Sequence, residues 1–284
     1  MLLDRDSILE PLQRLADELD STMSEAAEGV LAVANTAMER ALRVISVERG
    51  FDPLDFALVA FGGAGGLHVA ELLNRLGASR AIIPPAPGLL SAYGMLASAV
   101  TTERSRTVLV SSATSGFEQI LVAELEDLEG DAREAMLAEG SDPSMLTAEF
   151  WVDARYQGQS FELTVPAQDW ISRFHRSHFE RYGYERPETP VEAVTLRVTV
   201  SAPSPDFTPV SLDAASGPPP STSTDTFISG DLVQVESVRR EDLLAGHELR
   251  GPAIIQEYSS TTWVPPEFYV QVDQWGCLHL LATD

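Results

Sequence analysis

A glycine-rich turn is the segment of this sequence best suited to chemistry. It stands between an apolar run that begins at Leu58 and an amphipathic stretch that ends at Leu73. Glycine lacks a Cβ, so a ligand can approach its backbone, and a helix that starts there offers unpaired N–H groups to an anion. We expect a nucleotide phosphate or ribose here; the alternative is a tight turn that needs positive φ angles. The candidate nucleotide-binding residues are Gly62, Gly63, Ala64, Gly65 and Gly66.

His68 is the candidate catalytic residue. It occupies the position where the dinucleotide-binding fingerprint GxGxxG would have its last glycine, so the turn does not match that fingerprint. In the first turn of the following helix, its imidazole could donate a hydrogen bond to a phosphate or to a substrate carbonyl. The alternative is a histidine that caps or packs the helix.

The other candidate groups are less suited to catalysis or to metal binding. His175 and His178 are three residues apart, a helical spacing that can hold a metal, but the flanking Arg and Glu residues favour a solvated helix face. Cys277, the single cysteine, lies in a strand pattern and is expected in the core rather than as a nucleophile. We therefore predict no metal site.

The charge composition excludes several classes of function. The 19 basic residues are all arginines, against 43 acidic residues, and the formal net charge is -24. The absence of lysine excludes a phosphate-loop NTPase of the GxxxxGK[ST] type and a lysine Schiff base. Nucleic acid is not an expected partner, because phosphate binding depends on clustered basic residues. A GC-rich genome or adaptation to salt could each produce this composition.

The N-terminal part of the sequence predicts an α/β arrangement around the glycine-rich turn. Amphipathic helices are expected over residues 7–21 and from an N-cap at Ser24 to about Arg49. Residues 56–61 are almost wholly apolar, which is typical of a central strand buried on both faces. The alternation of strand and helix then continues, and a β-α-β-α order of elements favours parallel strands. Its further elements are a helix over 67–76, a strand over 81–83 and a helix over 89–100.

The remainder of the sequence predicts a β-rich α+β part. Helices are expected over 117–138 and 168–182, and residues 202–226 are rich in Pro, Ser and Thr, which predicts a long loop. We therefore expect an α/β domain over residues 1–112 and a β-rich domain over 113–284. Strands are predicted over 108–110, 147–156, 161–165, 194–201, 232–238, 253–258, 261–264, 269–272 and 277–281.

No apolar run reaches the roughly 20 residues of a membrane-spanning helix, and cytoplasm is the expected compartment.

Several collinear blocks of this sequence resemble the hydantoinase A / 5-oxoprolinase family. Together these blocks span roughly residues 20–282, so the similarity extends along almost the whole chain. The blocks are VERG-FDP at 47–53, LVAFGGAGGLH at 58–68, PPAPG-LLSAYG at 84–94, RYQGQSFEL at 155–163, FH with YGY at 174–184, and GPAIIQEY with STT at 251–262.

The resemblance implies a fold and a reaction. The family includes ATP-dependent hydantoinases and 5-oxoprolinases, and nucleotide-binding subunits of acetone and acetophenone carboxylases. Its core domain is similar to the actin and sugar-kinase ATPases, so residues 1–112 are expected to form part of the second ATPase lobe. In that fold a strand that ends in Gly-Gly touches the adenosine, which Gly62 to Gly66 match. ATP and Mg²⁺ are implied as cofactors of a complete assembly.

Two departures from the family pattern bear on function. The family's acidic DxGGTxxD turn, which holds phosphates and magnesium, is absent from this sequence, and family members are normally more than twice as long. Gly66 also stands where the family usually has proline. The chain therefore resembles only the C-terminal half of the family. We expect its partners to be an N-terminal ATPase-lobe chain and a hydantoinase B-type subunit.

The sequence is compatible with three functions. The first is the C-terminal part or split subunit of an enzyme that opens a small cyclic amide or imide after ATP phosphorylates its oxygen. The second is part of the nucleotide-binding subunit of an acetone-type carboxylase. The third is a non-catalytic assembly module. In each case we expect no ATP hydrolysis by the isolated chain, and a hydrophobic face where the missing lobe would dock.

Overall fold

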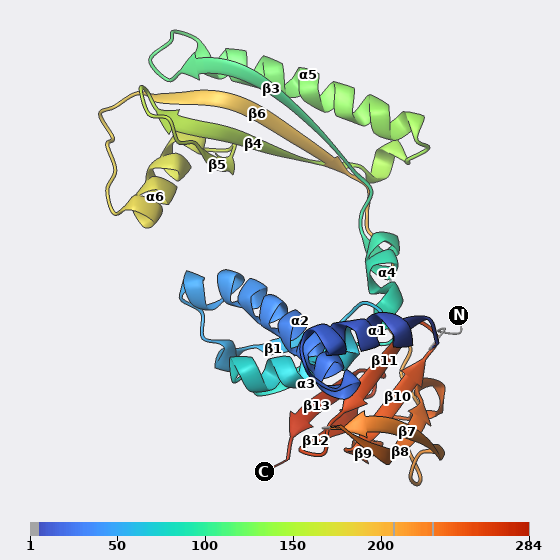
Figure 1. The fold of residues 1–284 in the computed structure, drawn as a ribbon. Coiled ribbons are helices and arrows are strands. Elements are labelled where there is room, and N and C mark those ends of the chain that lie inside the picture. The colour runs from blue at the N-terminus through green and yellow to red at the C-terminus, as the bar shows by residue number, and fades with distance from the viewer. Residues whose placement is uncertain (1–5, 207, 229, 284) are drawn as a thin grey trace. The chain divides into compact units, whose positions relative to one another are not determined.

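The computed structural model describes residues 6–206, 208–228 and 230–283. The chain forms two compact units (Figure 1). Unit 1 contains Met1–Met95 and Thr208–Asp284, and unit 2 contains Leu96–Phe207. The fold is α/β in class, as the sequence predicts. The boundaries differ from the division at residue 112, because the C-terminal strands complete the sheets of unit 1.

The helices of unit 1 precede and follow the glycine-rich turn. The long helix α2 begins one residue after Thr22, whose side chain accepts a hydrogen bond from the N–H of Glu25, while the Glu25 carboxylate accepts one from the N–H of Thr22. This capping box corrects the predicted N-cap at Ser24. The helices are α1 (Asp6–Glu18), α2 (Met23–Ile45), α3 (Gly65–Leu76) and α4 (Leu90–Ala97), with 3-10 turns η1 (Val47–Arg49), η2 (Pro53–Asp55), η3 (Pro87–Leu89) and η5 (Arg240–Asp242).

A five-stranded sheet positions the turn. Its strand order is β1-β2-β13-β12-β9, in which β1 and β2 are parallel and the other pairs antiparallel. The apolar run at 56–61 therefore forms an edge strand, and the prediction of a central strand buried on both faces is wrong for this chain. Its side that faces away from β2 has no strand among the described residues. The strands are β1 (Ala57–Val59), β2 (Arg80–Ile83), β9 (Glu248–Arg250), β12 (Phe268–Val272) and β13 (Leu278–Ala282).

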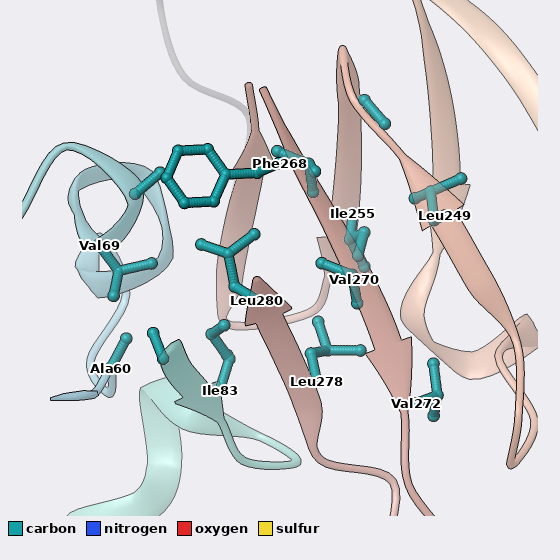
Figure 2. Close-up of a cluster of buried hydrophobic side chains, with 14 of the residues drawn as sticks. Ala60, Val69, Ile83, Leu249, Ile255, Phe268, Val270, Val272, Leu278 and Leu280 are labelled. Carbon is teal, nitrogen blue, oxygen red and sulfur yellow. The ribbon is translucent and has the colours of Figure 1, made fainter. Parts of the chain in front are cut away.

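A second, four-stranded sheet shares the core of unit 1. Its order is β11-β10-β8-β7, with bounds β7 (Ser221–Ile228), β8 (Asp231–Arg239), β10 (Ala253–Glu257) and β11 (Ser260–Val264). Strand β7 occupies the end of the segment expected to be a loop at 202–226. Figure 2 shows the shared core, in which Val69 of α3 lies with apolar side chains from both sheets, among them Ile255, Phe268 and Leu280.

Unit 2 is an antiparallel sheet with two helices. The sheet has the order β3-β6-β4-β5, and both helices bury apolar side chains against it, including Met136 of α5 and Phe174 of α6. The strand predicted at 108–110 is longer than expected and carries a bulge between Thr107 and Val110. The elements are β3 (Thr101–Ser111), α5 (Phe117–Ala138), η4 (Pro143–Met145), β4 (Thr147–Tyr156), β5 (Leu163–Pro166), α6 (Trp170–Tyr182) and β6 (Val191–Ser201).

Candidate functional site

The glycine-rich turn joins the end of β1 to the start of α3. Only Gly62 of its five residues has a positive φ, at 90°. Its N–H donates to the carbonyl of Pro87 over 2.7 Å, which ties the turn to the proline-rich loop after β2. Ala64 is the N-cap of α3 and supplies no side-chain cap, so the helix begins without a side-chain acceptor for its first N–H groups.

The hairpin between β10 and β11 packs against this turn and the proline-rich loop. A Cβ built on Gly66 would lie 2.6 Å from Oγ1 of Thr262, and one on Gly88 would overlap the carbonyl oxygen of Ser259. A Cβ on Gly63 would be 3.4 Å from that same oxygen. Close packing against a hairpin far away in the sequence thus explains why Gly66 and Gly88 have no room for a side chain. Next to Gly62, by contrast, no atom of the described residues other than its chain neighbours lies within 4 Å of an added Cβ.

His68 is committed to a contact between two helices. Its Nδ1 lies 2.8 Å from Oδ1 of Asn35, a residue of α2 that is only 8% exposed. The hydrogen bond links α3 to α2 and gives the buried amide oxygen a partner. This arrangement supports the packing role for His68. Its candidate catalytic role stays a prediction.

An apolar groove of about 660 Å³ adjoins the turn on the outer side of β1. It is bounded by α2, the segment at 51–56, β1 and α3, and no charged side chain lines it. Ser46 and His68 are the polar residues of its wall, and the hydroxyl of Ser46, the C-cap of α2, donates to the carbonyl of Leu42 in that helix. Such a wall suits apolar side chains better than phosphates.

A partly buried arginine contacts the end of β2, directly before the proline-rich loop. Nη2 of Arg240 donates to the carbonyl oxygens of Ile83 and Gly276, at 3.1 and 2.6 Å. Burial lowers the pKa of the Arg240 guanidinium, and burial also raises the pKa of Glu257, although the positive charge of Arg240 opposes that second shift. Glu257 in turn accepts a hydrogen bond from the N–H of Ala86. Sequence reasoning missed this pair, because its two members belong to separate elements.

The histidine pair of α6 forms separate hydrogen bonds in unit 2. Nδ1 of His175 lies 2.7 Å from the hydroxyl of Tyr156, and Nδ1 of His178 lies 2.8 Å from the carbonyl of Tyr184. These bonds belong to a cluster of aromatic rings around Tyr156. Within residues 6–206, 208–228 and 230–283, no group of three or more His, Cys, Asp and Glu residues could hold a metal ion.

Two family sequence models match the chain almost end to end. The model described as "Hydantoinase/oxoprolinase" matches residues 1–104, and the one described as "Hydantoinase/oxoprolinase C-terminal domain" matches residues 111–283. The chain belongs to the hydantoinase/oxoprolinase family. The glycine-rich turn, α2 and α3 all fall in the first match, and unit 2 falls largely in the second.

Relatives within the hydantoinase/oxoprolinase family are much longer than this chain. An uncharacterized protein of Methanocaldococcus jannaschii is 31% identical over 98% of this chain and 41% of its own length. Caprolactamase subunit alpha of Pseudomonas jessenii is 28% identical over 95% of this chain and 42% of its own. The chain therefore spans less than half the length of these relatives.

A solved structure of a larger protein has the same fold. The nucleotide-free structure of acetone carboxylase, from a study of ATP-dependent acetone carboxylation, superposes with a TM-score of 0.84 at 22% identity, over 99% of this chain and 43% of the other. At that identity the likeness concerns the fold. In the described part of this chain no helix could traverse a bilayer, because none combines sufficient length with sufficient apolar character.

Proposed function

We propose that this chain provides the C-terminal part of an ATP-dependent enzyme that opens a small cyclic amide or imide. The observation that carries the proposal is the glycine-rich turn of a hydantoinase/oxoprolinase family member, which leads directly into the uncapped N-terminus of α3. ATP transfers its γ-phosphoryl group to the amide oxygen and leaves as ADP. Water then attacks the activated carbon, the ring C–N bond breaks, and phosphate departs.

The nucleotide contacts belong to the backbone of the turn in this proposal. Gly62, Gly63, Ala64 and Gly65 would contact the adenosine, and the open space beside Gly62 is the side from which it would approach. Gly66 contributes the close packing of α3 on the β10–β11 hairpin. His68 would act mainly by holding α3 against α2.

The remaining parts of the enzyme would correspond to the portion of the relatives' length that this chain does not cover. An N-terminal ATPase lobe would supply the acidic turn that holds Mg²⁺ and the phosphates, and a hydantoinase B-type subunit would complete the assembly. The names of relatives support an assembly in part, since one of them is the alpha subunit of a caprolactamase. We propose a cytoplasmic location for the complex, where ATP is available.

Substitutions at Ala64 test the nucleotide site. Asp and Ser are both favoured at helix N-caps, so neither should harm α3. The carboxylate that Ala64→Asp introduces would place a negative charge beside the adenosine and repel the anionic nucleotide as a whole, whereas the uncharged hydroxyl that Ala64→Ser introduces would not. In an assembly with the N-terminal part, we expect Ala64→Asp to weaken ATP binding at least about 10-fold, which corresponds to about 1.4 kcal/mol, and Ala64→Ser to change it little. Equal affinities for both variants would reject the site.

The substrate class is tested by ATP turnover of the same assembly. Hydantoin, 5-oxoproline and caprolactam should each be tried as stimulants of ADP release, with the isolated chain as an inactive control. The alternative function, part of an acetone-type carboxylase, predicts stimulation by acetone with bicarbonate instead. An assembly that binds ATP without turnover on any of these compounds would favour the non-catalytic module.

A further inference from the structure

We infer that the open edge of β1 and the adjoining apolar groove receive an extended apolar strand from the part of the family's length that this chain does not contain. The inference deepens the proposed function, because it rests on the N-terminal part as partner. It names the surface and the mode of binding.

The backbone of β1 presents unpaired groups along its open side. The N–H of Ala60 donates to the carbonyl of Ile82 over 2.9 Å, so Ala60 and Leu58 direct their backbone groups toward β2. Alternate residues of a parallel strand face opposite neighbours, so Ala57 and Val59 direct theirs outward. Among the described residues no strand pairs with that side. An added strand would find donors and acceptors at the required spacing.

The side chains of this edge suit a covered position. Phe56, Val59 and Phe61 are each half or more exposed, at 50, 54 and 56%. Residues 56–64 contain no charged side chain, whereas exposed edge strands usually carry charges that prevent pairing with other chains. The residues around β1 therefore have the composition of a strand with neighbours on both sides.

The groove supplies the apolar contacts that a strand pair alone lacks. It lies between β1 and helices α2 and α3, with Met38, Ile45 and Leu72 in its wall. Every second side chain of a strand added to β1 would point to the same face as the groove. Backbone pairing would give affinity, and apolar side chains in the groove would give specificity.

The size and the charge of the chain favour this occupant over a second copy. The relatives are more than twice as long as the segment they share with this chain, so most of their length is available to cover the edge. Two copies of the chain would each bring a net charge of -24, and their mutual repulsion opposes pairing of identical edges.

The test uses the full chain and the part of the Methanocaldococcus jannaschii relative that it does not cover. Binding is measured by calorimetry without nucleotide, and hydrogen exchange is followed at the Ala57 and Val59 amides. We expect a 1:1 complex in which exchange at both amides slows at least 100-fold, whereas both exchange freely in the chain alone. Because nucleotide is left out, this assay tests only the docking of the partner. Its failure can therefore be distinguished from a failure of ATP turnover.

Variants of Val59 isolate the backbone contribution. Val59→Pro removes an N–H that points away from β2 and leaves the β1–β2 pairing intact, so we expect binding at least 10-fold weaker. Val59→Thr keeps the N–H and the branched shape, and its affinity should stay within 3-fold of the parent chain. Val59→Lys keeps the N–H but brings a charge to the groove, and it should weaken binding even if Val59→Pro fails to fold.

Three results would overturn the inference. The first is no binding, and the second is binding with the two amides still exchanging freely. The third is a dimer of the chain alone in which the same amides are protected, because it would assign the edge to a second copy.

Discussion

Glycine residues around the turn serve two different purposes. Gly62 adopts a positive φ and has free space beside it, whereas Gly66 and Gly88 are in contact with the β10–β11 hairpin. The sequence points correctly to the turn as an unusual segment. It cannot distinguish these purposes, because the contacting hairpin lies about 200 residues further along the chain.

Substitution of Gly66 should expose the cost of the close packing. We expect Gly66→Ala to lower the free energy of unfolding by about 1–3 kcal/mol, since the new methyl group overlaps Thr262. The matched control is Gly29→Ala in α2, where no atom lies within 4 Å of the added Cβ. It should raise stability by about 0.5–1 kcal/mol. Urea unfolding of both variants checks this, and equal effects would contradict it.

The Asn35–His68 pair should behave as a structural unit. Asn35→Ala leaves the imidazole of His68 without its partner and should cost about 1–3 kcal/mol of unfolding free energy. The double variant with His68→Ala should cost less than the sum of the two single changes. Asn74→Ala, on the exposed side of α3, serves as the control and should stay within about 0.5 kcal/mol. Additive effects would show that the two residues act independently.

Asp273 should contribute a pH-dependent part of stability. Burial raises its pKa, but hydrogen bonds from His279, Cys277 and Trp275 outweigh burial and leave the pKa below its ordinary value. The contribution is therefore present above the unfolded pKa, near 4, and is lost as the pH falls through the lower folded value. Asp273→Asn should cost about 1–2 kcal/mol at pH 7 and less at pH 3. A cost that does not change with pH would refute the assignment.

Strand β1 is the element for which sequence and structure disagree most clearly. An apolar run of this kind predicts a strand buried on both faces, and the chain places it at an edge. The physical reason is that the apolar composition of a strand reflects the neighbours it is adapted to contact, and among the described residues no strand lies on that side of β1. The neighbouring elements α3 and β2 were predictable because their apolar patterns depend on the core of this chain, which includes Val69, Leu73 and Ile83.

At the start of α2, the N-cap predicted from the sequence, Ser24, can be compared with the N-cap in the structure, Thr22. Thr22→Ala removes the hydroxyl that accepts from the Glu25 N–H and should destabilise the chain by about 1 kcal/mol. Ser24→Ala changes the residue that sequence reasoning favoured as the cap, and it should be nearly neutral. Thermal unfolding compares the two variants directly. A larger loss for Ser24→Ala would mean that the helix starts later in solution.

At the scale of the whole molecule, the acidic composition should make stability depend on salt. A net charge of -24 means that the folded chain is destabilised by self-repulsion, which ions screen over about 10 Å at 0.1 M. We expect the urea midpoint to rise as NaCl increases from about 0.05 to about 1 M. A falling midpoint would indicate that the surface ion pairs, such as Arg106 with Glu124, outweigh the repulsion.

The division into two units was the part of the architecture that sequence could not predict. The order of elements predicts an α/β domain over residues 1–112 followed by a β-rich domain over 113–284, and this division stays a prediction. Contacts instead join the C-terminal strands to the N-terminal helices, with unit 2 as a continuous insertion. Strand partners far apart in sequence leave no local signal, so pairing of β13 with β2 could not be inferred.

That pairing has a consequence for biosynthesis. Strand β2 meets its partner β13 through Ile83 and Leu278, so roughly 200 residues must be translated after β2 before the sheet can close. At ribosomal rates of about 5–20 residues per second, about 10–40 s pass before β13 is translated. During this time the apolar edges of β1 and β2 remain uncovered. During that interval unit 2 can already fold, because it is complete before the last strands of unit 1 emerge. The nascent chain is therefore most exposed to chaperones and to misassembly at its N-terminal sheet.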